Sequence, residues 1–499
     1  MMNANLTINY DDIIGKIDPR LWGSFTEQLG RSIYTGIYQP GHPQADSNGF
    51  RKDVIEAILK LKVPLIRYPG GNFVSGYNWE DGIGPKDQRP RRLDLAWKSI
   101  ETNEFGLHEF INWCRLVNAQ PDMAINLGTR GIDAARNLIE YCNFSKGTYW
   151  SDLRRKNGAE EPFNIKVWSL GNEMDGDWQI GHKTAEEYGR LAHETAKAMR
   201  IVDPNIELIA SGSSLHNMPT FGKWEETILD HVYDDIDYLS LHQYYDDYDH
   251  DIAKFLASSE DFDSFINDVI AICDAVKARK HSNKIINLAM DEWNVWYHSK
   301  ETDAQQKPWQ QAPTLLEDHY TFADALVVGG LAITLMKHAD RVKIGCLAQL
   351  VNVIAPIMTR PSGEPSVWYQ SIFYPFMQVS NLGQGLSLKV KKEVKAYQIN
   401  NRDIPYVDAA AVYNSKKQEI VLFIENKSSD SINLNCSFNN FDIQKLLTST
   451  TFSGYNLDLT NEQQVMKLRT SKTTSLEDDC LRAQLEPYSW NVARIKVEV

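Results

Sequence analysis

Hydrophobic and polar positions follow two different periods along the first three quarters of the chain. Eight short apolar runs occur at residues 21–26, 64–68, 122–127, 165–170, 207–211, 238–241, 285–290 and 342–348. Helical patterns, with apolar residues every three to four positions, follow at 50–62, 105–117, 131–142, 184–202, 223–232, 261–280, 320–339 and 367–379. Alternating strands and helices indicate parallel strands with right-handed crossovers. Eight such units predict an α/β fold, a (β/α)8 TIM barrel with enlarged loops.

The alternative to a barrel is a doubly wound open sheet. Such a sheet that binds a dinucleotide carries a glycine-rich fingerprint at its first strand-to-helix turn. The segment after residue 26 has no such fingerprint. The barrel is therefore the preferred interpretation.

After residue 380 the pattern changes to short alternating segments separated by Asn, Ser, Asp and Gly. These segments are 386–392, 406–414, 419–427, 431–438, 465–470 and 490–499. They predict an antiparallel β-sandwich domain at the C-terminal end. Residues 3–10 show the same alternation, so we expect the N-terminal strand to join that sandwich. The expected domains are residues 1–17 with the sandwich, 18–380 as the barrel, and 381–499 as the sandwich itself.

Composition narrows the class of protein. The formal net charge of −14 argues against a nucleic-acid partner and against an anionic membrane surface. The 13 Trp, 22 Tyr and 18 Phe suit a packed core and also suit sugar rings, whose C–H faces stack on aromatic planes. No apolar run reaches the roughly 18 residues of a membrane span, and the first residues lack the pattern of a signal peptide. We therefore expect a cytoplasmic protein.

Polar side chains follow six of the eight predicted strands. In a barrel of this type the functional groups lie at the C-terminal ends of the strands. The residues at these ends are Glu27, Asn72, Asn172, Glu173, His242, Tyr244, Glu292 and Gln349. They are predicted to converge on one rim of the barrel.

Glu173 and Glu292 are the strongest candidates for chemistry. Hydrolysis of a glycosidic bond needs two carboxyl groups, one to protonate the leaving oxygen and one to meet the anomeric carbon. Paired carboxylates also bind metals or cap helices. Both residues follow apolar strands beside Asn and Trp, which weakens the capping interpretation, and no HxH or HExxH motif accompanies them. We expect neither a metal nor a cofactor.

Three motifs carry a resemblance to a known family: WSLGNEMDG at 168–176, MDEWNVW at 290–296 and RYPGGNFVSGYNWEDGIGP at 67–85. Together they resemble the α-L-arabinofuranosidases of glycoside hydrolase family 51, over essentially the whole chain. The GNE triplet alone indicates the broader clan A of retaining barrel glycosidases. The resemblance implies a retaining, exo-acting α-L-arabinofuranosidase that releases terminal arabinofuranose from oligosaccharides of arabinan or arabinoxylan by double displacement.

The resemblance also implies a role for each matching residue. Glu173 aligns with the general acid/base and Glu292 with the nucleophile. Asn172 resembles the residue that holds the sugar 2-hydroxyl, Tyr244 the phenol that orients the nucleophile, and His242 a residue that supports the acid/base.

The remaining positions are implied to form the walls of the pocket. Glu27, Asn72 and Gln349 match positions that read the furanose hydroxyls and ring oxygen, Trp97 and Trp296 match pocket-wall aromatics, and Trp178 lies toward the leaving group. Asp291 is interpreted as a solvated or structural charge. A homo-oligomer, often a hexamer in the family, is implied as well.

Other functions stay open at this stage. A β-xylosidase or an endoglucanase of the same clan would share the GNE triplet. A non-catalytic carbohydrate-binding protein on the same scaffold and a metal-dependent barrel hydrolase are rivals from other classes. The sequence does not distinguish arabinan from arabinoxylan as the source of the substrate.

Overall fold

A closed barrel of eight parallel strands forms the larger part of the molecule. The structure is a computed structural model that describes residues 2–360 and 366–498. The barrel strands follow the order β10-β11-β2-β3-β6-β7-β8-β9. Their bounds are β2 (Gly23–Phe25), β3 (Leu65–Tyr68), β6 (Gln120–Ile125), β7 (Val167–Leu170), β8 (Glu207–Ala210), β9 (Tyr238–Tyr245), β10 (Asn287–Val295) and β11 (Val342–Leu347). Each overlaps one of the eight predicted runs, so the predicted barrel is confirmed.

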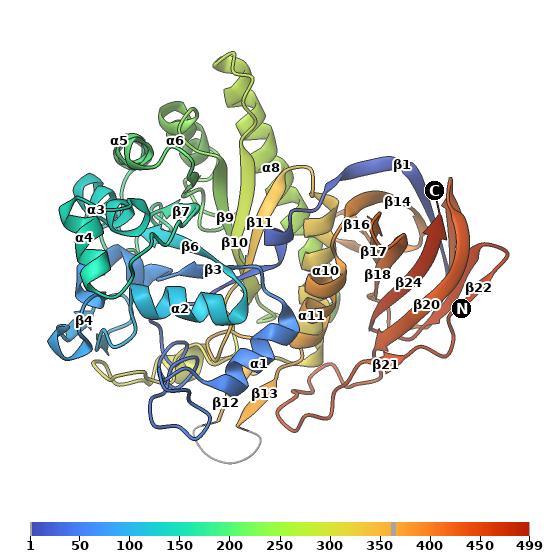
Figure 1. Cartoon of the computed structure of the whole chain (residues 1–499). Coiled ribbons are helices and arrows are strands. Elements are labelled where there is room, and N and C mark those ends of the chain that lie inside the picture. The colour runs from blue at the N-terminus through green and yellow to red at the C-terminus, as the bar shows by residue number, and fades with distance from the viewer. Residues whose placement is uncertain (1, 361–365, 499) are drawn as a thin grey trace.

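Helices surround the barrel on the outside (Figure 1). In α1, Val54, Ala57, Ile58 and Leu61 are buried at the spacing that the periodicity requires. The α-helices are α1 (Lys52–Leu61), α2 (Leu107–Val117), α3 (Ile132–Asn143), α4 (Tyr149–Lys156), α5 (Ala185–Val202), α6 (Lys223–Val232), α7 (Ile252–Leu256), α8 (Ser258–Arg279), α9 (Lys300–Asp303), α10 (Phe322–Lys337) and α11 (Phe373–Leu382). Short 3-10 turns are η1 (Pro19–Trp22), η2 (Asn72–Gly76), η3 (Trp79–Gly82) and η4 (Lys86–Gln88).

The last predicted helix begins later than expected. Its first residues form a strand, β13 (Val367–Tyr369), which pairs antiparallel with β12 (Ile357–Thr359). Val, Trp and Tyr fit a pleated surface well, and a partner strand is available to them here. The prediction of a helix from residue 367 is therefore wrong, and α11 starts at Phe373.

The C-terminal part of the chain forms one ten-stranded sheet in the order β21-β20-β24-β18-β17-β14-β1-β19-β23-β22. The N-terminal strand β1 lies inside it, antiparallel to β14 and parallel to β19. Both chain ends therefore lie in this part of the molecule (Figure 1). The bounds are β1 (Met2–Lys16), β14 (Leu386–Val394), β17 (Val407–Asn414), β18 (Glu419–Asn426), β19 (Ile432–Asn439), β20 (Asp442–Phe452), β21 (Arg469–Thr470), β22 (Ser475–Glu477), β23 (Cys480–Leu485) and β24 (Ser489–Glu498).

Helix α10 joins the two parts. Nearly all of its residues are buried, from Phe322 to Met336. The helix lies between the barrel strands and the C-terminal sheet (Figure 1), where it contacts β17 and β18 as well as β10. A helix that is apolar on every side needs a partner on every side. The central strand β17 is also buried on both faces. Ala409 faces the core of the sheet, and Ala410 faces the barrel.

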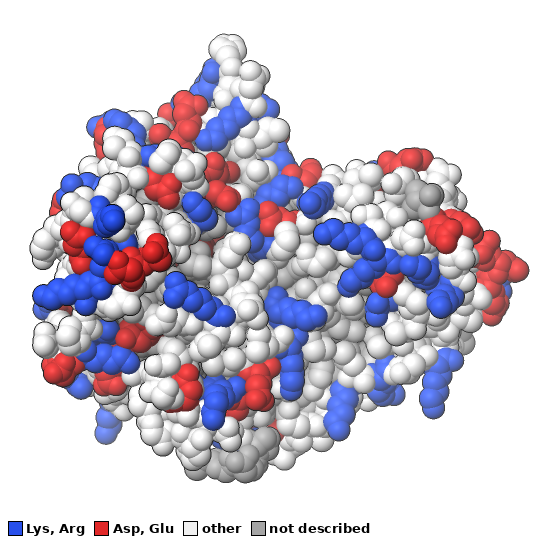
Figure 2. All heavy atoms as spheres, in the orientation of Figure 1, with Lys and Arg blue, Asp and Glu red and all other residues white. Residues whose placement is uncertain are grey.

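Two small antiparallel ribbons protrude from the loops. One is β4 (Arg92–Asp94) with β5 (Ser99–Glu101), and the other is β15 (Ala396–Ile399) with β16 (Arg402–Pro405). Within the described residues, none of the helices combines the length and apolar character needed to cross a bilayer. On the face in Figure 2, acidic and basic side chains are intermixed over the barrel, and basic side chains gather over the C-terminal sheet.

Candidate active site

A cavity of about 570 Å³ opens at the C-terminal ends of the barrel strands. Nine of the eleven predicted site residues line it: Glu27, Asn72, Trp97, Glu173, Trp178, Tyr244, Glu292, Trp296 and Gln349. The other two, Asn172 and His242, are buried behind this wall. Each of them contacts residues that do line the cavity. The structure therefore brings all eleven residues together.

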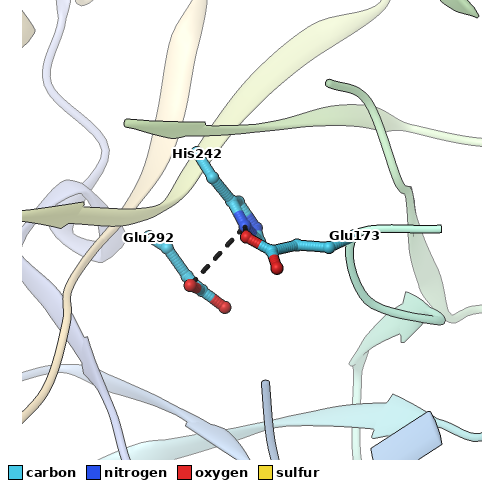
Figure 3. Close-up of side chains that lie close together, drawn as sticks. All are labelled: Glu173, His242 and Glu292. Carbon is cyan, nitrogen blue, oxygen red and sulfur yellow. Dashed lines mark hydrogen bonds and ion pairs between the residues drawn. The ribbon is translucent and has the colours of Figure 1, made fainter. Parts of the chain in front are cut away.

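The two candidate carboxyl groups face each other across His242 (Figure 3). Glu173 Oε1 lies 3.0 Å from His242 Nδ1, and Glu292 Oε2 lies 3.5 Å from the same nitrogen. The three groups bring one atom each within 4.8 Å of one another. Two carboxyls about 5–5.5 Å apart are typical of retaining glycosidases, whereas inverting enzymes hold them farther apart to admit a water.

A bulge in β10 aims Glu292 into the pocket. Between Ala289 and Glu292 the strand has one residue more than its neighbour β9, and the pairing with β11 shifts at the same place. Side chains normally alternate between the two faces of a strand, but an extra residue re-aims them. As a result, the consecutive residues Asp291 and Glu292 both contact Arg67 and His242 inside the barrel.

Glu292 is held by two donors. Arg67 donates to Oε1 at 2.7 Å and the Tyr244 hydroxyl donates to Oε2 at 2.7 Å. Arg67 also donates to Asn172 Oδ1 at 2.6 Å, which fixes the orientation of that amide. The sequence analysis missed Arg67. A signal for it was present, since Arg67 is a cation inside an apolar strand. A buried cation needs an anionic partner, which would have pointed to a nearby carboxylate.

Of the two interpretations of Asp291, solvated or structural, the structure excludes the solvated one. Its side chain is buried rather than solvated. It accepts a hydrogen bond from Ser240 at 2.5 Å and lies 3.4 Å from His242 Nε2 and 3.5 Å from Arg67 Nε. Asp291 therefore supports the two side chains that contact the candidate carboxyls.

Glu173 has donors on both oxygens. The Trp178 indole donates to Oε2 at 2.7 Å, and Gln179 donates to the same oxygen at 3.3 Å. Gln179 also donates to Asn72, which connects Glu173 to the PGGN turn. Glu173 itself has a φ of 44°, an uncommon conformation for a residue with a side chain. Gln179 is a second residue that the sequence analysis missed.

Glu27 lies in another wall of the same cavity. It accepts from the Phe73 amide at 2.8 Å and from the Trp97 indole at 2.9 Å, and Gln349 donates to its second oxygen at 3.2 Å. Gly71 makes this packing possible, because a Cβ there would lie 2.1 Å from Glu27 Oε2. Burial raises the pKa of Glu27 to about 8, against the two hydrogen bonds that lower it.

The pKa values of the buried groups in the site shift in different directions. Burial alone would raise the pKa of Glu173, but the contacts with His242, Trp178 and Gln179 outweigh it and lower that pKa. Burial and the nearby Glu173 raise the pKa of Glu292, against His242 and Arg67. Burial acts to lower the pKa of His242, but the surrounding carboxylates overcome it and raise that pKa to about 10. His242 is therefore protonated beside Glu173 at neutral pH.

Aromatic side chains shape the mouth of the cavity. Trp296 packs edge-on against Tyr244, with ring centroids 5.5 Å apart, and Lys300 Nζ lies 5.2 Å from the Trp296 ring. The Trp178 side chain is 45% exposed, although its indole nitrogen contacts Glu173. The exposed part of Trp178 is available to the C–H surface of a sugar ring.

A (β/α)8 barrel with two carboxyl groups this close at the C-terminal ends of its strands is typical of a glycoside hydrolase of the retaining type. Comparison with known proteins gives the family. An α-L-arabinofuranosidase 1 domain matches residues 57–252, and an α-L-arabinofuranosidase C-terminal domain matches residues 291–489. The chain belongs to the α-L-arabinofuranosidases of glycoside hydrolase family 51.

Individual relatives agree with this assignment. The intracellular exo-α-(1→5)-L-arabinofuranosidase 1 of Bacillus subtilis is 53% identical, over 99% of both chains. An exo-α-(1→6)-L-arabinofuranosidase of Bifidobacterium longum is 46% identical, over 99% of this chain and 97% of the relative. The solved structure of a family 51 α-L-arabinofuranosidase from Bifidobacterium longum superposes with a TM-score of 0.95 at 40% identity, over 99% of this chain and 100% of that one. The predicted family and its exo-acting, retaining glycosidase activity are confirmed, in preference to the β-xylosidase, endoglucanase and binding-protein alternatives.

Proposed function

We propose that this enzyme removes terminal α-(1→5)-linked L-arabinofuranosyl residues from arabinan-derived oligosaccharides. The observation that carries the chemistry is the pair of carboxyl oxygens of Glu173 and Glu292 within 4.8 Å of each other. The linkage is supported by three relatives at 52–54% identity that are named intracellular exo-α-(1→5)-L-arabinofuranosidases.

Glu292 is the nucleophile in this proposal. It attacks the anomeric carbon while Glu173 protonates the leaving oxygen, which gives a covalent β-linked glycosyl-enzyme. Glu173 then takes a proton from water, and the water displaces Glu292 with a second inversion. Arg67 and Tyr244 orient the attacking carboxylate and stabilise its negative charge.

The proton that Glu173 must deliver is stored on His242. The arrangement found here pairs a protonated His242 with an ionised Glu173 along a 3.0 Å hydrogen bond. Moving that proton by one bond gives neutral His242 and protonated Glu173, with the same number of protons in the site. A sugar that displaces water from the cavity favours the neutral pair, because burial penalises both charges.

The sugar-binding contacts follow from the same geometry. Glu27, Asn72 and Gln349 would hold the furanose hydroxyls and ring oxygen, and Asn172 would hold the 2-hydroxyl. Trp97 and Trp296 would flank the ring, and Trp178 would contact the leaving group beside Glu173. Their support is that these side chains line one cavity with Glu173 and Glu292, or, in the case of Asn172, donate to Asn72, which lines it.

We propose that no metal takes part. Glu173, His242 and Glu292 could surround a cation by distance alone, but Arg67 already places a guanidinium 2.7 Å from Glu292 and His242 carries a proton. A second cation would meet this positive charge. Activity should survive prolonged dialysis against EDTA. A loss that added divalent metal restores would contradict the proposal.

The organisation of the protein is proposed as follows. Residues 18–380 form the catalytic barrel, and residues 1–17 and 381–499 form a second domain, whose main strands join in one ten-stranded sheet. A cytoplasmic location is supported by the relatives named intracellular.

A homo-oligomer rests on the family resemblance, and light scattering coupled to size-exclusion chromatography should give a multiple of 57.0 kDa. A monomer at micromolar concentration would contradict it.

Azide rescue separates the roles of the two glutamates. In Glu173→Ala, an aryl α-L-arabinofuranoside with a good leaving group should still form the glycosyl-enzyme, and azide should then release the α-azide. In Glu292→Ala no glycosyl-enzyme forms, so azide should displace the leaving group once and give the β-azide. NMR of the anomeric proton distinguishes the products.

The same substrates test the activity itself. The wild-type enzyme should hydrolyse an aryl α-L-arabinofuranoside and leave the matching arabinopyranoside and β-xylopyranoside intact. A β-azide from Glu173→Ala would reverse the assignment of the roles. Full activity of both variants on arabinobiose would remove both residues from the mechanism.

A further inference from the structure

A second cavity, of about 600 Å³, lies where the barrel meets the C-terminal part of the chain. Its size is within the range of about 300–1,000 Å³ that is usual for ligand sites. One wall consists of the loop after β9 and the starts of α7 and α8. The other wall is the β15–β16 hairpin, through Ile399, Asn400, Arg402 and Ile404. We call this cavity the junction groove.

The junction groove adjoins the catalytic cavity. Four residues line both: Asn217, Gln243, Tyr244 and Asp246. None of the residues around Glu27, Trp97 and Gln349 is shared, so the two cavities meet only on the side of Tyr244 and Asn217.

That side is the one a leaving group would take. Glu173 protonates the leaving oxygen in the proposed mechanism, so the leaving sugar starts beside Glu173. Leu215 and Asn217 follow β8, the barrel strand next to the one that carries Glu173. His216, between them, donates its backbone amide to the side chain of Gln243 at 3.1 Å, which connects this loop to β9. A chain leaving Glu173 over Asn217 and Gln243 enters the junction groove.

The hairpin wall is fixed in place. The Tyr397 hydroxyl donates to the backbone oxygen of Ala253 in α7 at 3.0 Å, and Arg402 donates to Ser264 in α8 at 3.0 Å. The turn itself is tight, because Asn400 and Asn401 have φ values of 50° and 63°, as a two-residue hairpin turn requires. The amide of Asn400, which can donate and accept, is thereby held at the edge of the groove.

The charge of the junction groove indicates which kind of ligand it can bind. Its carboxylates, Asp246, Asp247, Asp249, Glu260 and Asp261, outnumber its cations, Lys254 and Arg402. Carboxylates accept hydrogen bonds from hydroxyl groups and repel anions. The lining therefore suits a neutral, hydroxyl-rich chain and disfavours a phosphorylated or uronic-acid-bearing one.

We propose that the junction groove binds the second and third sugar residues on the leaving-group side of a neutral arabino-oligosaccharide. This inference rests on the proposed function, since it takes Glu173 as the acid. It makes the C-terminal part of the chain a direct participant in choosing substrate length. The enzyme would then favour oligosaccharides of three or more residues over arabinobiose.

Chain-length kinetics test the proposal. For the wild-type enzyme, kcat/KM should rise from arabinobiose to arabinotetraose, all α-(1→5)-linked. Asn400→Gly keeps the positive φ of the turn and removes the amide, so it should reduce kcat/KM on arabinotetraose about two- to tenfold, the value of one hydrogen bond. Its kcat/KM on an aryl α-L-arabinofuranoside, which has no further sugars, should stay unchanged.

Asn401→Gly is the matched control. Asn401 lies next to Asn400 in the same turn and does not line the groove, so this variant should keep the wild-type length dependence. A wild-type kcat/KM that is equal for the disaccharide and the tetrasaccharide would overturn the proposal, as would equal effects of the two variants. Failure to hydrolyse the aryl furanoside at all would instead overturn the proposed function.

Discussion

Arg67, Asp291 and His242 form a charged network beneath the two candidate carboxyl groups. Each of these three side chains is buried, and each contacts at least one of the other two or one of the two candidate glutamates. Buried charges are stable only when they are paired, so the network holds its members in fixed positions. Asp291 contacts His242 but does not line the cavity, so any effect that it has on a bound sugar must pass through its neighbours.

Asp291→Asn should move the alkaline limb of the kcat/KM profile to lower pH. The Asp291 carboxylate helps to raise the pKa of His242. Without that negative charge, the proton shared by His242 and Glu173 is lost at lower pH, by about one to two units. Initial rates on an aryl α-L-arabinofuranoside from pH 4 to 10 measure the shift. Ser240→Ala, which removes only a hydrogen bond to Asp291, should shift the limb less; an unmoved limb in Asp291→Asn would make Asp291 purely structural.

At the scale of the element, backbone irregularities place the side chains of the candidate active site. The bulge in β10 turns Glu292 into the pocket beside Asp291. The turn after β3 brings the Phe73 amide to Glu27, and Gly71 in that turn has a φ of 28°. A regular strand or turn would offer neither contact.

Gly71→Ala should therefore damage the binding wall. Its Cβ would lie 2.1 Å from Glu27 Oε2, so the carboxylate must move and lose its hydrogen bonds. With a pKa of about 8, Glu27 is mostly protonated at neutral pH, so we expect kcat/KM on an aryl furanoside to fall about two- to tenfold for each of these neutral hydrogen bonds. Gly76→Ala is the control, since a Cβ there meets nothing within 4 Å. Equal kinetics of the two variants would show that Glu27 does not depend on this turn.

At the scale of the whole molecule, a buried ion cluster connects the barrel to the C-terminal sheet. Asp408 on β17 accepts from Lys337 on α10 and from Lys392 on β14, each at 2.7 Å. Burial alone would raise the pKa of Asp408, but the two lysines outweigh it and hold that pKa well below its usual range. The cluster stabilises the packing of α10 against the C-terminal sheet.

Asp408→Asn should destabilise the protein by about 3–5 kcal/mol, because it leaves two lysines without their counter-charge. Because the pKa is lowered on folding, this stabilisation is fully present above the unfolded value of about 3.9 and is lost as pH falls below it. Thermal unfolding should show a lower Tm for the variant at pH 7 and a smaller difference below pH 4. The exposed Asp430→Asn should leave Tm unchanged; a similar drop in both variants would mean that the cluster has no special role.

The sequence by itself determined the elements and most of the site. The eight apolar runs and the helical periods follow from local geometry, because a strand repeats every two residues and a helix every 3.6. Polar residues at the ends of those runs, such as Glu173 and Gln349, could be predicted for the rim because parallel barrel strands all end on one side. The PGGN and DEWNVW motifs were sufficient to indicate the family.

Only the tertiary structure decided how these residues meet. The distance between Glu173 and Glu292 depends on the pairing of β9 with β10, which sets Glu292 beside His242 and places His242 between the two carboxyls. The role of Asp291 depends on a bulge that no periodicity reveals. The junction groove depends on a hairpin more than 100 residues beyond Glu292. These features arise from contacts between distant parts of the chain, and hydrophobic patterning specifies which face of an element is buried without specifying its partner.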